Sequence, residues 1–255
     1  MRVQNKYVAA FAILAVVSCL GFALLAILAG LGNRAGWWDF RTGIQYLKWA
    51  AYGEVAAIAG SLISLVVAAF KSKSVILLSA IGAIIGIAAL AIPALNWITA
   101  HRVPPIHDVT TDTENPPAFV SIIKERQNAP NSVEYGGEKI AKLQRMAYPD
   151  IEPLLIDAPP ARAFQLASEA AQKMGWKIAN ADARNGLIEA TATTFWFGFK
   201  DDVAIRITEQ GHGSRIDVRS VSRVGVSDIG TNAKRIRTFL KLLKNMHASR
   251  LEKKG

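Results

Sequence analysis

The feature that most constrains the fold is a set of three apolar runs in the first hundred residues. They cover roughly residues 7–31, 49–70 and 75–98, and the first and third contain no charged side chain. Each run is long enough to cross about 30 Å of hydrocarbon as a helix that rises about 1.5 Å per residue. The sequence therefore predicts that residues 1–98 form a three-helix transmembrane anchor and that the lipid bilayer is a partner of the chain.

Charged residues are distributed very unequally between this region and the rest of the chain. Residues 1–98 hold nine of the fifty Asp, Glu, Lys and Arg side chains, and residues 99–255 hold the others. The net charge of +10 is shared equally between the two regions, so neither has the concentrated basic patch that nucleic-acid binding requires. We therefore expect no nucleic-acid partner. The single cysteine, Cys19, excludes an intrachain disulfide.

Basic residues beside the three runs indicate how the chain crosses the membrane. Four lie on the side of the N-terminus and three on the other side: Arg2, Lys6, Lys71 and Lys73 against Arg34, Arg41 and Lys48. Because Lys and Arg are enriched in cytoplasmic loops, the N-terminus is expected inside. Three spans then place residues 99–255 on the outer side, which in a bacterium means a multi-pass inner (plasma) membrane protein with a periplasmic C-terminal domain.

One acidic residue, Glu54, falls within a predicted span. An acid inside the membrane is a candidate functional residue by default. Glu54 also lies about one turn from the aromatic residues Trp49 and Tyr52, where its carboxylate could reach water or Lys48. Both interpretations remain open at this stage.

The stretch after the third run, residues 99–119, is rich in proline, threonine and aspartate and includes IHDVTTDTENPPAF. Proline fixes an extended chain, and threonine and aspartate form local turns. We expect an ordered tether whose acids and threonines dock onto the domain that follows. Its histidines and acids lack the spacing of a metal site, so no metal and no cofactor are predicted.

Residues 120–248 are predicted to form an α+β two-layer sandwich, and 249–255 a frayed tail. Two short helices, near 118–127 and 138–146, come first. The order that follows is strand, helix, four strands, helix, with the strands at 151–157, 176–181, 187–194, 202–209 and 215–222. Short turns join the last four strands, which favours an antiparallel meander. Alternating side chains give it one apolar and one polar face, as expected when helices cover one side.

Three motifs then carry a resemblance to a known family: IHDVTTDTENPPAF at 106–119, FWFGFKDDV at 195–203 and DVRSVSRVGVSDIGTNAKRI at 217–236. In this order they resemble the bacterial and plastid family called domain of unknown function 1499 (DUF1499). The three preceding helices look like those of its proteobacterial members. The resemblance implies a membrane-tethered domain of unassigned activity. The predicted topology is also similar, at the level of fold alone, to helix-grip or TBP-like modules of envelope lipoproteins.

Two groups of side chains are candidate sites. The first is a polar cluster in which arginine–carboxylate pairs, or an active site, would form; it consists of Asp108, Asp112, Asp201, Asp202, Arg219, Arg223 and Asp228. Ser227 or Asp228 is also expected to cap the last helix. The second is an apolar loop that either folds back onto the open end of the sheet or contacts a membrane or partner; it consists of Phe195, Trp196, Phe197 and Phe199.

Three hypotheses for function follow. The chain is a non-enzymatic envelope protein whose domain binds a partner or envelope component. Alternatively, it binds a lipid or small apolar ligand beside Trp176 and the apolar loop. Thirdly, it is an enzyme that uses the polar cluster. The first is favoured over catalysis, because the sequence has no GxSxG, HExxH, P-loop or GxGxxG motif and no visible nucleophile–base spacing.

Overall fold

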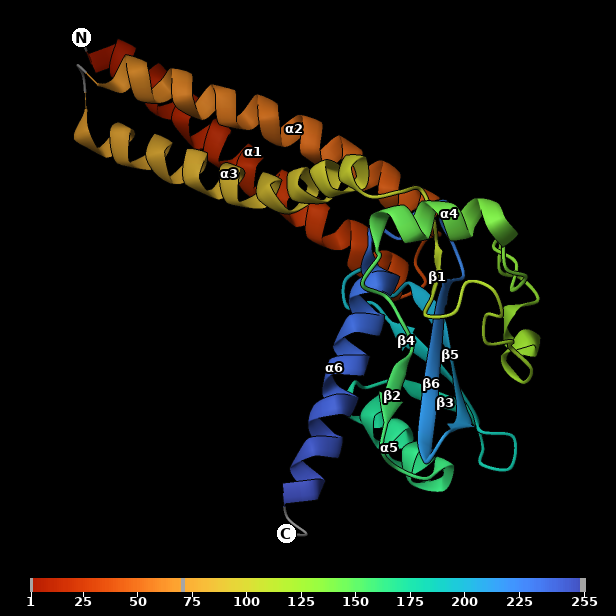
Figure 1. The fold of residues 1–255 in the computed structure, drawn as a ribbon. Helices are drawn as coiled ribbons and strands as arrows, with labels where there is room; N and C mark the ends of the chain where they lie inside the picture. Colours follow the sequence, from red (N-terminus) through yellow and green to blue (C-terminus); the bar gives the residue numbers. More distant parts are fainter. Residues whose placement is uncertain (1, 70–71, 253–255) are drawn as a thin grey trace. The chain divides into compact units, whose positions relative to one another are not determined.

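The computed structural model describes residues 2–69 and 72–252 (Figure 1). The chain divides into two compact units. The first contains the residues up to Ile98 together with Phe195–Gly198, and the second contains Thr99–Thr194 and the residues from Phe199 onward. The fold is thus three long helices followed by an α+β unit with an antiparallel sheet, as the sequence predicted.

The first unit contains three helices that are long and apolar enough to cross a membrane: α1 (Arg2–Arg34), α2 (Phe40–Ala68) and α3 (Lys73–Arg102). Helix α3 continues four residues beyond the predicted span, through the sequence expected to begin the tether. Asp39 caps α2 by accepting backbone N–H bonds from Arg41 and Thr42.

Small residues allow the three helices to approach closely. At Gly82 of α3 an added Cβ would lie 2.8 Å from Ser61 Oγ and 2.9 Å from Val16 Cγ2, so glycine is required there. The hydroxyl of Ser79 donates to that of Ser64 over 2.8 Å. Close contact through small residues and interhelical hydrogen bonds is how helices associate in lipid, where apolar burial gives no driving force.

The second unit is built on a six-stranded antiparallel sheet in the order β1-β6-β5-β4-β3, with β2 also paired to β6. The strands are β1 (Asp108–Thr110), β2 (Leu154–Ile156), β3 (Lys177–Asp182), β4 (Leu187–Thr193), β5 (Lys200–Gln210) and β6 (Gly213–Ser222). Strands β3 to β6 form the predicted meander, and Gly186, with φ of 62°, makes the turn between β3 and β4.

Strand β1 lies within residues 99–119, which the sequence predicts to be an ordered tether docked onto the following domain. Its Asp108 pairs with Val221 and its Thr110 with Arg219, so this stretch forms an edge of the sheet. The side-chain amide of Gln144 completes that edge, since it accepts from Thr110 N over 2.9 Å and donates to Thr110 O over 2.6 Å. Only three residues pair, which is too short to show the alternation that identifies a strand.

Helices cover one face of the sheet, as expected (Figure 1). They are α5 (Pro160–Lys173) and α6 (Thr231–Glu252), while α4 (Gly137–Ala147) lies at the β1 edge, where Gln144 bonds to Thr110. Alternate residues of β4, β5 and β6, such as Ile188, Ile205 and Ile216, pack with them into the main core. Trp176 and Phe239 are stacked there, with ring centroids 5.2 Å apart and an interplanar angle of 21°.

The opposite, polar face of the sheet is covered as well. The segment between β1 and α4, which includes the short 3₁₀ helix η1 (Ile122–Arg126), packs Phe119 and Ile122 against Ala204 and Val221. Polar side chains that alternation alone would direct toward water are therefore buried in the second unit. They are Glu189, Thr191, Asp202, Asp217 and Arg219.

Candidate functional site

The predicted polar cluster divides into separate ion-pair groups on the two faces of the sheet. Asp201 and Asp202 are neighbours in β5, and successive side chains of a strand point to opposite faces. Asp202 therefore joins the covered polar face together with Asp108 and Asp112, whereas Asp201 faces the helices.

The first group is the pair of Asp108 with Arg219. Arg219 donates from Nε to Asp108 Oδ1 over 3.0 Å and from Nη2 to Oδ2 over 2.7 Å, which is the bidentate geometry of a strong arginine–carboxylate pair. Both side chains are almost wholly buried, at 4% and 6% exposure. The pair joins β1 to β6 across the edge of the sheet.

The same guanidinium has further partners around it. It donates to the carbonyl oxygens of Pro117 and Val133. It also lies 5.2 Å from the ring centroid of Phe119 and 5.5 Å from that of Tyr135, within the range of cation–π contacts. Arg219 thereby fastens the segment that covers the polar face.

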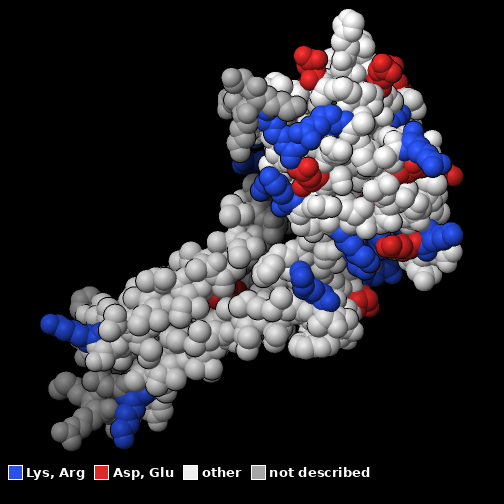
Figure 2. All heavy atoms as spheres, turned by 90° about the horizontal axis from the view of Figure 1, so that it is seen from below, with Lys and Arg blue, Asp and Glu red and all other residues white. Residues whose placement is uncertain are grey.

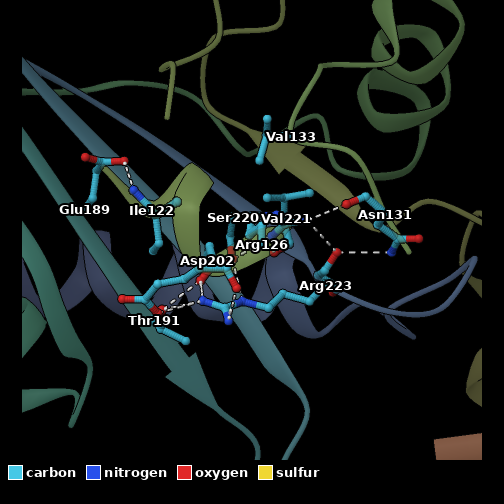
Figure 3. A network of polar contacts seen from close by, with 12 residues as sticks. Ile122, Arg126, Asn131, Val133, Glu189, Thr191, Asp202, Ser220, Val221 and Arg223 are labelled. Atoms are coloured by element: carbon cyan, nitrogen blue, oxygen red, sulfur yellow. Dashed lines mark hydrogen bonds and ion pairs between the residues drawn. The ribbon is translucent and has the colours of Figure 1, made fainter. Parts of the chain in front are cut away.

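The second group is centred on Asp202 (Figure 3). Arg223 donates from Nε and Nη2 to its two carboxylate oxygens, each over 2.8 Å. Arg126 donates to Oδ2 over 2.6 Å, and the hydroxyl of Thr191 donates to Oδ1 over 2.7 Å. Asp202 is fully buried, and two arginines and a hydroxyl compensate its charge there.

The third group lies near the other end of the same face. Asp112 and Asp217 accept from the two arginines Arg206 and Arg215 at distances of 2.9–3.1 Å. The arginines are partly exposed, at 22% and 32%, whereas the side chain of Asp217 is 1% exposed. The hydrogen bond from Arg215 to Asp217 is the main cause of a raised pKa for this guanidinium.

On the helix face, Asp201 pairs with Arg235 of α6, and Asp228 takes the predicted capping role. Asp228 accepts from the backbone N–H of Asn232 over 2.6 Å and from that of Gly230 over 2.8 Å, which caps the first turn of α6. Burial, the largest effect, raises the pKa of the Asp228 carboxyl above its ordinary value despite these two hydrogen bonds.

Two buried acids of the polar face are absent from the predicted cluster: Asp217 of the third group, and Glu189. Glu189 holds the covering segment. Its carboxylate accepts backbone N–H bonds from Val120, Ser121 and Ile122 over 2.8, 2.9 and 3.2 Å. These N–H groups lie at the N-terminal end of η1, so the Glu189 carboxylate on the sheet stabilises the start of this short helix (Figure 3).

Comparison with protein-family models places this sequence in a family. Residues 108–243, which include β1 and end within α6, match the family model described as "Protein of unknown function (DUF1499)". The match covers more than half of the chain. The chain belongs to the DUF1499 family. A search of the curated proteins found no match. All the ion-pair groups described above lie inside the matched residues.

The apolar loop joins β4 to β5 of the DUF1499 domain, but its residues Phe195–Gly198 group with the helices of the first unit. The indole of Trp196 donates to Ile27 O over 3.2 Å, and the amide of Asn33 donates to Phe197 O over 2.6 Å. These contacts are with α1 inside the first unit, and both alternatives, closure of the open end of the sheet or contact with a membrane or partner, stay predictions. Phe197 is buried and Phe195 is 84% exposed, whereas Phe199 belongs to the second unit.

The apolar residues predicted to share a ligand cavity lie in two different places. Phe195 and Trp196 line an apolar pocket of about 450 Å³ in the first unit, together with Ala23, Ile27 and Ile92. Trp176 fills the core against Phe239. Beside it is a pocket of about 270 Å³, below the roughly 300 Å³ at which ligand pockets usually begin, and part of its lining is polar, from Thr231 and Lys234. Among residues 2–69 and 72–252, no three His, Cys, Asp or Glu side chains are placed to share a metal ion.

Proposed function

We propose that the chain is an integral protein of the bacterial inner (plasma) membrane that presents its DUF1499 domain on the periplasmic side, where the domain binds a partner or envelope component. Three helices able to span a bilayer supply the anchor. The excess of basic residues beside the N-terminus and the second short loop supports the periplasmic side. On the face drawn in Figure 2, charged side chains are more numerous over the second unit than over the three long helices of the first.

The observation that carries a non-catalytic function is the internal pairing of the polar cluster. Asp108 and Asp202 are each held by bidentate arginine, and Asp228 is held by backbone N–H groups. A general acid or base must exchange its proton with a substrate within hydrogen-bond reach. Buried carboxylates whose oxygens accept hydrogen bonds from arginine instead hold the covering segment on the sheet. Recognition of a partner then falls to the outer surface of the domain.

Helix α6 supplies a surface suited to a partner. Lys234, Lys241 and Lys244 are exposed and recur at helical spacing, opposite the buried stripe that contains Phe239. From Thr231 to Glu252 the only acid is Glu252 itself. We define these three lysines as the α6 lysine stripe, and the partner that fits it carries negative charge.

Site-specific photo-crosslinking in whole cells tests this proposal. A photo-reactive residue placed in the full-length chain at Lys241 should give a discrete adduct with an acidic protein or envelope polymer. The matched control is Lys177, another exposed lysine, which lies on strand β3 away from α6. The Lys241 adduct should fall at least about tenfold when Lys234 and Lys244 are changed to glutamate, since each repulsive charge at an interface costs on the order of 1 kcal/mol or more.

Three outcomes have distinct meanings. A discrete adduct from Lys241 but not from Lys177 supports partner binding through the α6 lysine stripe. Adducts with lipid alone support the lipid-binding alternative. Equal, diffuse crosslinking from both positions contradicts a binding surface on α6.

A further inference from the structure

Glu54 lies in the middle of α2, within the first unit, in a setting that the proposed function does not use. Its side chain is turned into the helix bundle and the residue is 2% exposed. Among the described residues the weak thiol donor Cys19 is the polar group beside it, and no nitrogen or oxygen donor reaches either carboxylate oxygen. Of the two interpretations left open by the sequence, this burial between the helices favours a functional acid over one that reaches interfacial water or Lys48.

The neighbours of Glu54 come from all three helices. A Cβ added to Gly86 of α3 would lie 2.7 Å from Glu54 Oε1 and 3.2 Å from the sulfur of Cys19, so the carboxyl and the thiol flank the same glycine. The hydroxyl of Ser61, on α2, is 3.9 Å from that sulfur.

No cation faces this carboxyl within the described part of the bundle. From α1 the titratable group beside it is the Cys19 thiol, and from α3 the backbone of Gly86 approaches instead of a titratable side chain. The basic residues of the described helices lie toward their ends, and the nearest in sequence, Lys48, is exposed. The net charge in the interior of the helix bundle therefore depends on whether Glu54 holds a proton.

An isolated ionised carboxylate in a low-dielectric interior costs far more than a neutral one, and a buried group without a partner becomes neutral instead. From this burial and the lack of a cation or of a nitrogen or oxygen donor beside the carboxyl group in the described residues, we propose that Glu54 is an intramembrane proton-binding site. Its carboxylic acid keeps its proton while the three helices are packed. Loss of that proton places an unpaired charge between α1, α2 and α3 and separates them.

Infrared spectroscopy of the full-length chain in lipid bilayers tests the proposal, because a protonated carboxylic acid has a C=O stretching band distinct from that of a carboxylate. At pH 8 exposed carboxyl groups, with ordinary pKa values of about 4, are ionised. We expect one such band to persist at pH 8, to shift when the glutamates carry ¹³C, and to disappear completely in Glu54→Gln. Asp39→Asn, which removes the exposed acid that caps α2, is the matched control and should leave the band unchanged.

The ¹³C experiment needs no substitution, so even where Glu54→Gln does not fold it shows whether a glutamate keeps its proton. Glu54→Asp in the ¹³C-glutamate-labelled chain then separates Glu54 from the other buried glutamate, Glu189, because a band from position 54 no longer shifts. The shift with ¹³C-glutamate also separates Glu54 from Asp228, the aspartate whose carboxyl pKa is raised in the second unit. Absence of a protonated-glutamate band at pH 8, or persistence of that band in folded Glu54→Gln, overturns the proposal.

Discussion

Replacing Arg219 by methionine should destabilise the second unit far more than an ordinary surface substitution. The change leaves the carboxylate of Asp108 buried without its two charge-assisted bonds of 3.0 and 2.7 Å. Removing one partner of a buried ion pair costs about 3–5 kcal/mol, a large share of the roughly 5–15 kcal/mol that stabilises a typical domain. The carbonyls of Pro117 and Val133 lose a donor at the same time.

The assay is urea unfolding of the full-length chain in mild detergent, followed by circular dichroism. Apolar helices keep their internal hydrogen bonds in a micelle, so the transition reports the sheet unit. With a slope of about 2 kcal/mol per molar urea, the midpoint should fall by about 1.5–2.5 M. Adding Asp108→Asn to Arg219→Met should restore about half of this loss or more, because the uncompensated charge is then gone.

The matched control is Arg145→Met. Arg145 also pairs with an acid, Glu138, but these side chains are 48% and 78% exposed. An exposed pair contributes about 0–1 kcal/mol, so its loss should barely move the midpoint. If Arg219→Met costs no more than Arg145→Met, or if the double variant is less stable than Arg219→Met alone, the buried pair does not hold the cover as described.

Three further changes test other parts of the account by the same unfolding assay. Gln144→Leu leaves the buried N–H and C=O of Thr110 unpaired and should cost about 1–3 kcal/mol, whereas a loss below about 0.5 kcal/mol would show that the amide does not complete the β1 edge. Tyr135→Phe removes a buried hydroxyl that has no partner, so it should be neutral or stabilising at pH 7. Burial, and then the charge of Asp108, raise the pKa of Tyr135 to about 12, so the folded chain keeps this proton to a higher pH than the unfolded chain does. The free energy of unfolding of the parent should therefore fall from pH 10 to 12 more steeply than that of Tyr135→Phe. Equal slopes would contradict this. The raised pKa of the Asp228 carboxyl likewise makes the free energy of unfolding fall as the pH rises above 3.8, the ordinary value. Asp228→Asn should flatten that slope, while its amide oxygen keeps the helix cap. An unchanged slope would refute this role of Asp228.

Long periodic patterns made most of the fold predictable. The three apolar runs gave the helices, and the alternation around Ile188, Ile205 and Ile216 gave the strands and their core face. Alternation also separates Asp201 from Asp202, although the two residues are adjacent along the chain. Period-two reasoning applied to the candidate residues themselves would have found this.

The cover over the polar face could not be predicted in the same way. It depends on contacts between irregular segments and strands far away in the sequence, such as Arg126 with Asp202 and the 120–122 backbone with Glu189. Neither segment has a period of its own. The excess of arginines and acids on the strands was the available signal, since charges directed toward a sheet face in such number require either solvent or partners.

The position of the domain relative to the membrane is the central claim and is tested most directly by single-cysteine labelling. Cys19 is buried in the helix bundle, so it should remain silent toward an impermeant maleimide. Lys244→Cys on α6 should react in intact spheroplasts, whereas Lys73→Cys, an exposed site at the start of α3, should react only after lysis. The opposite pattern, with Lys73→Cys labelled from outside and Lys244→Cys protected, would place the DUF1499 domain in the cytoplasm and contradict the proposed function.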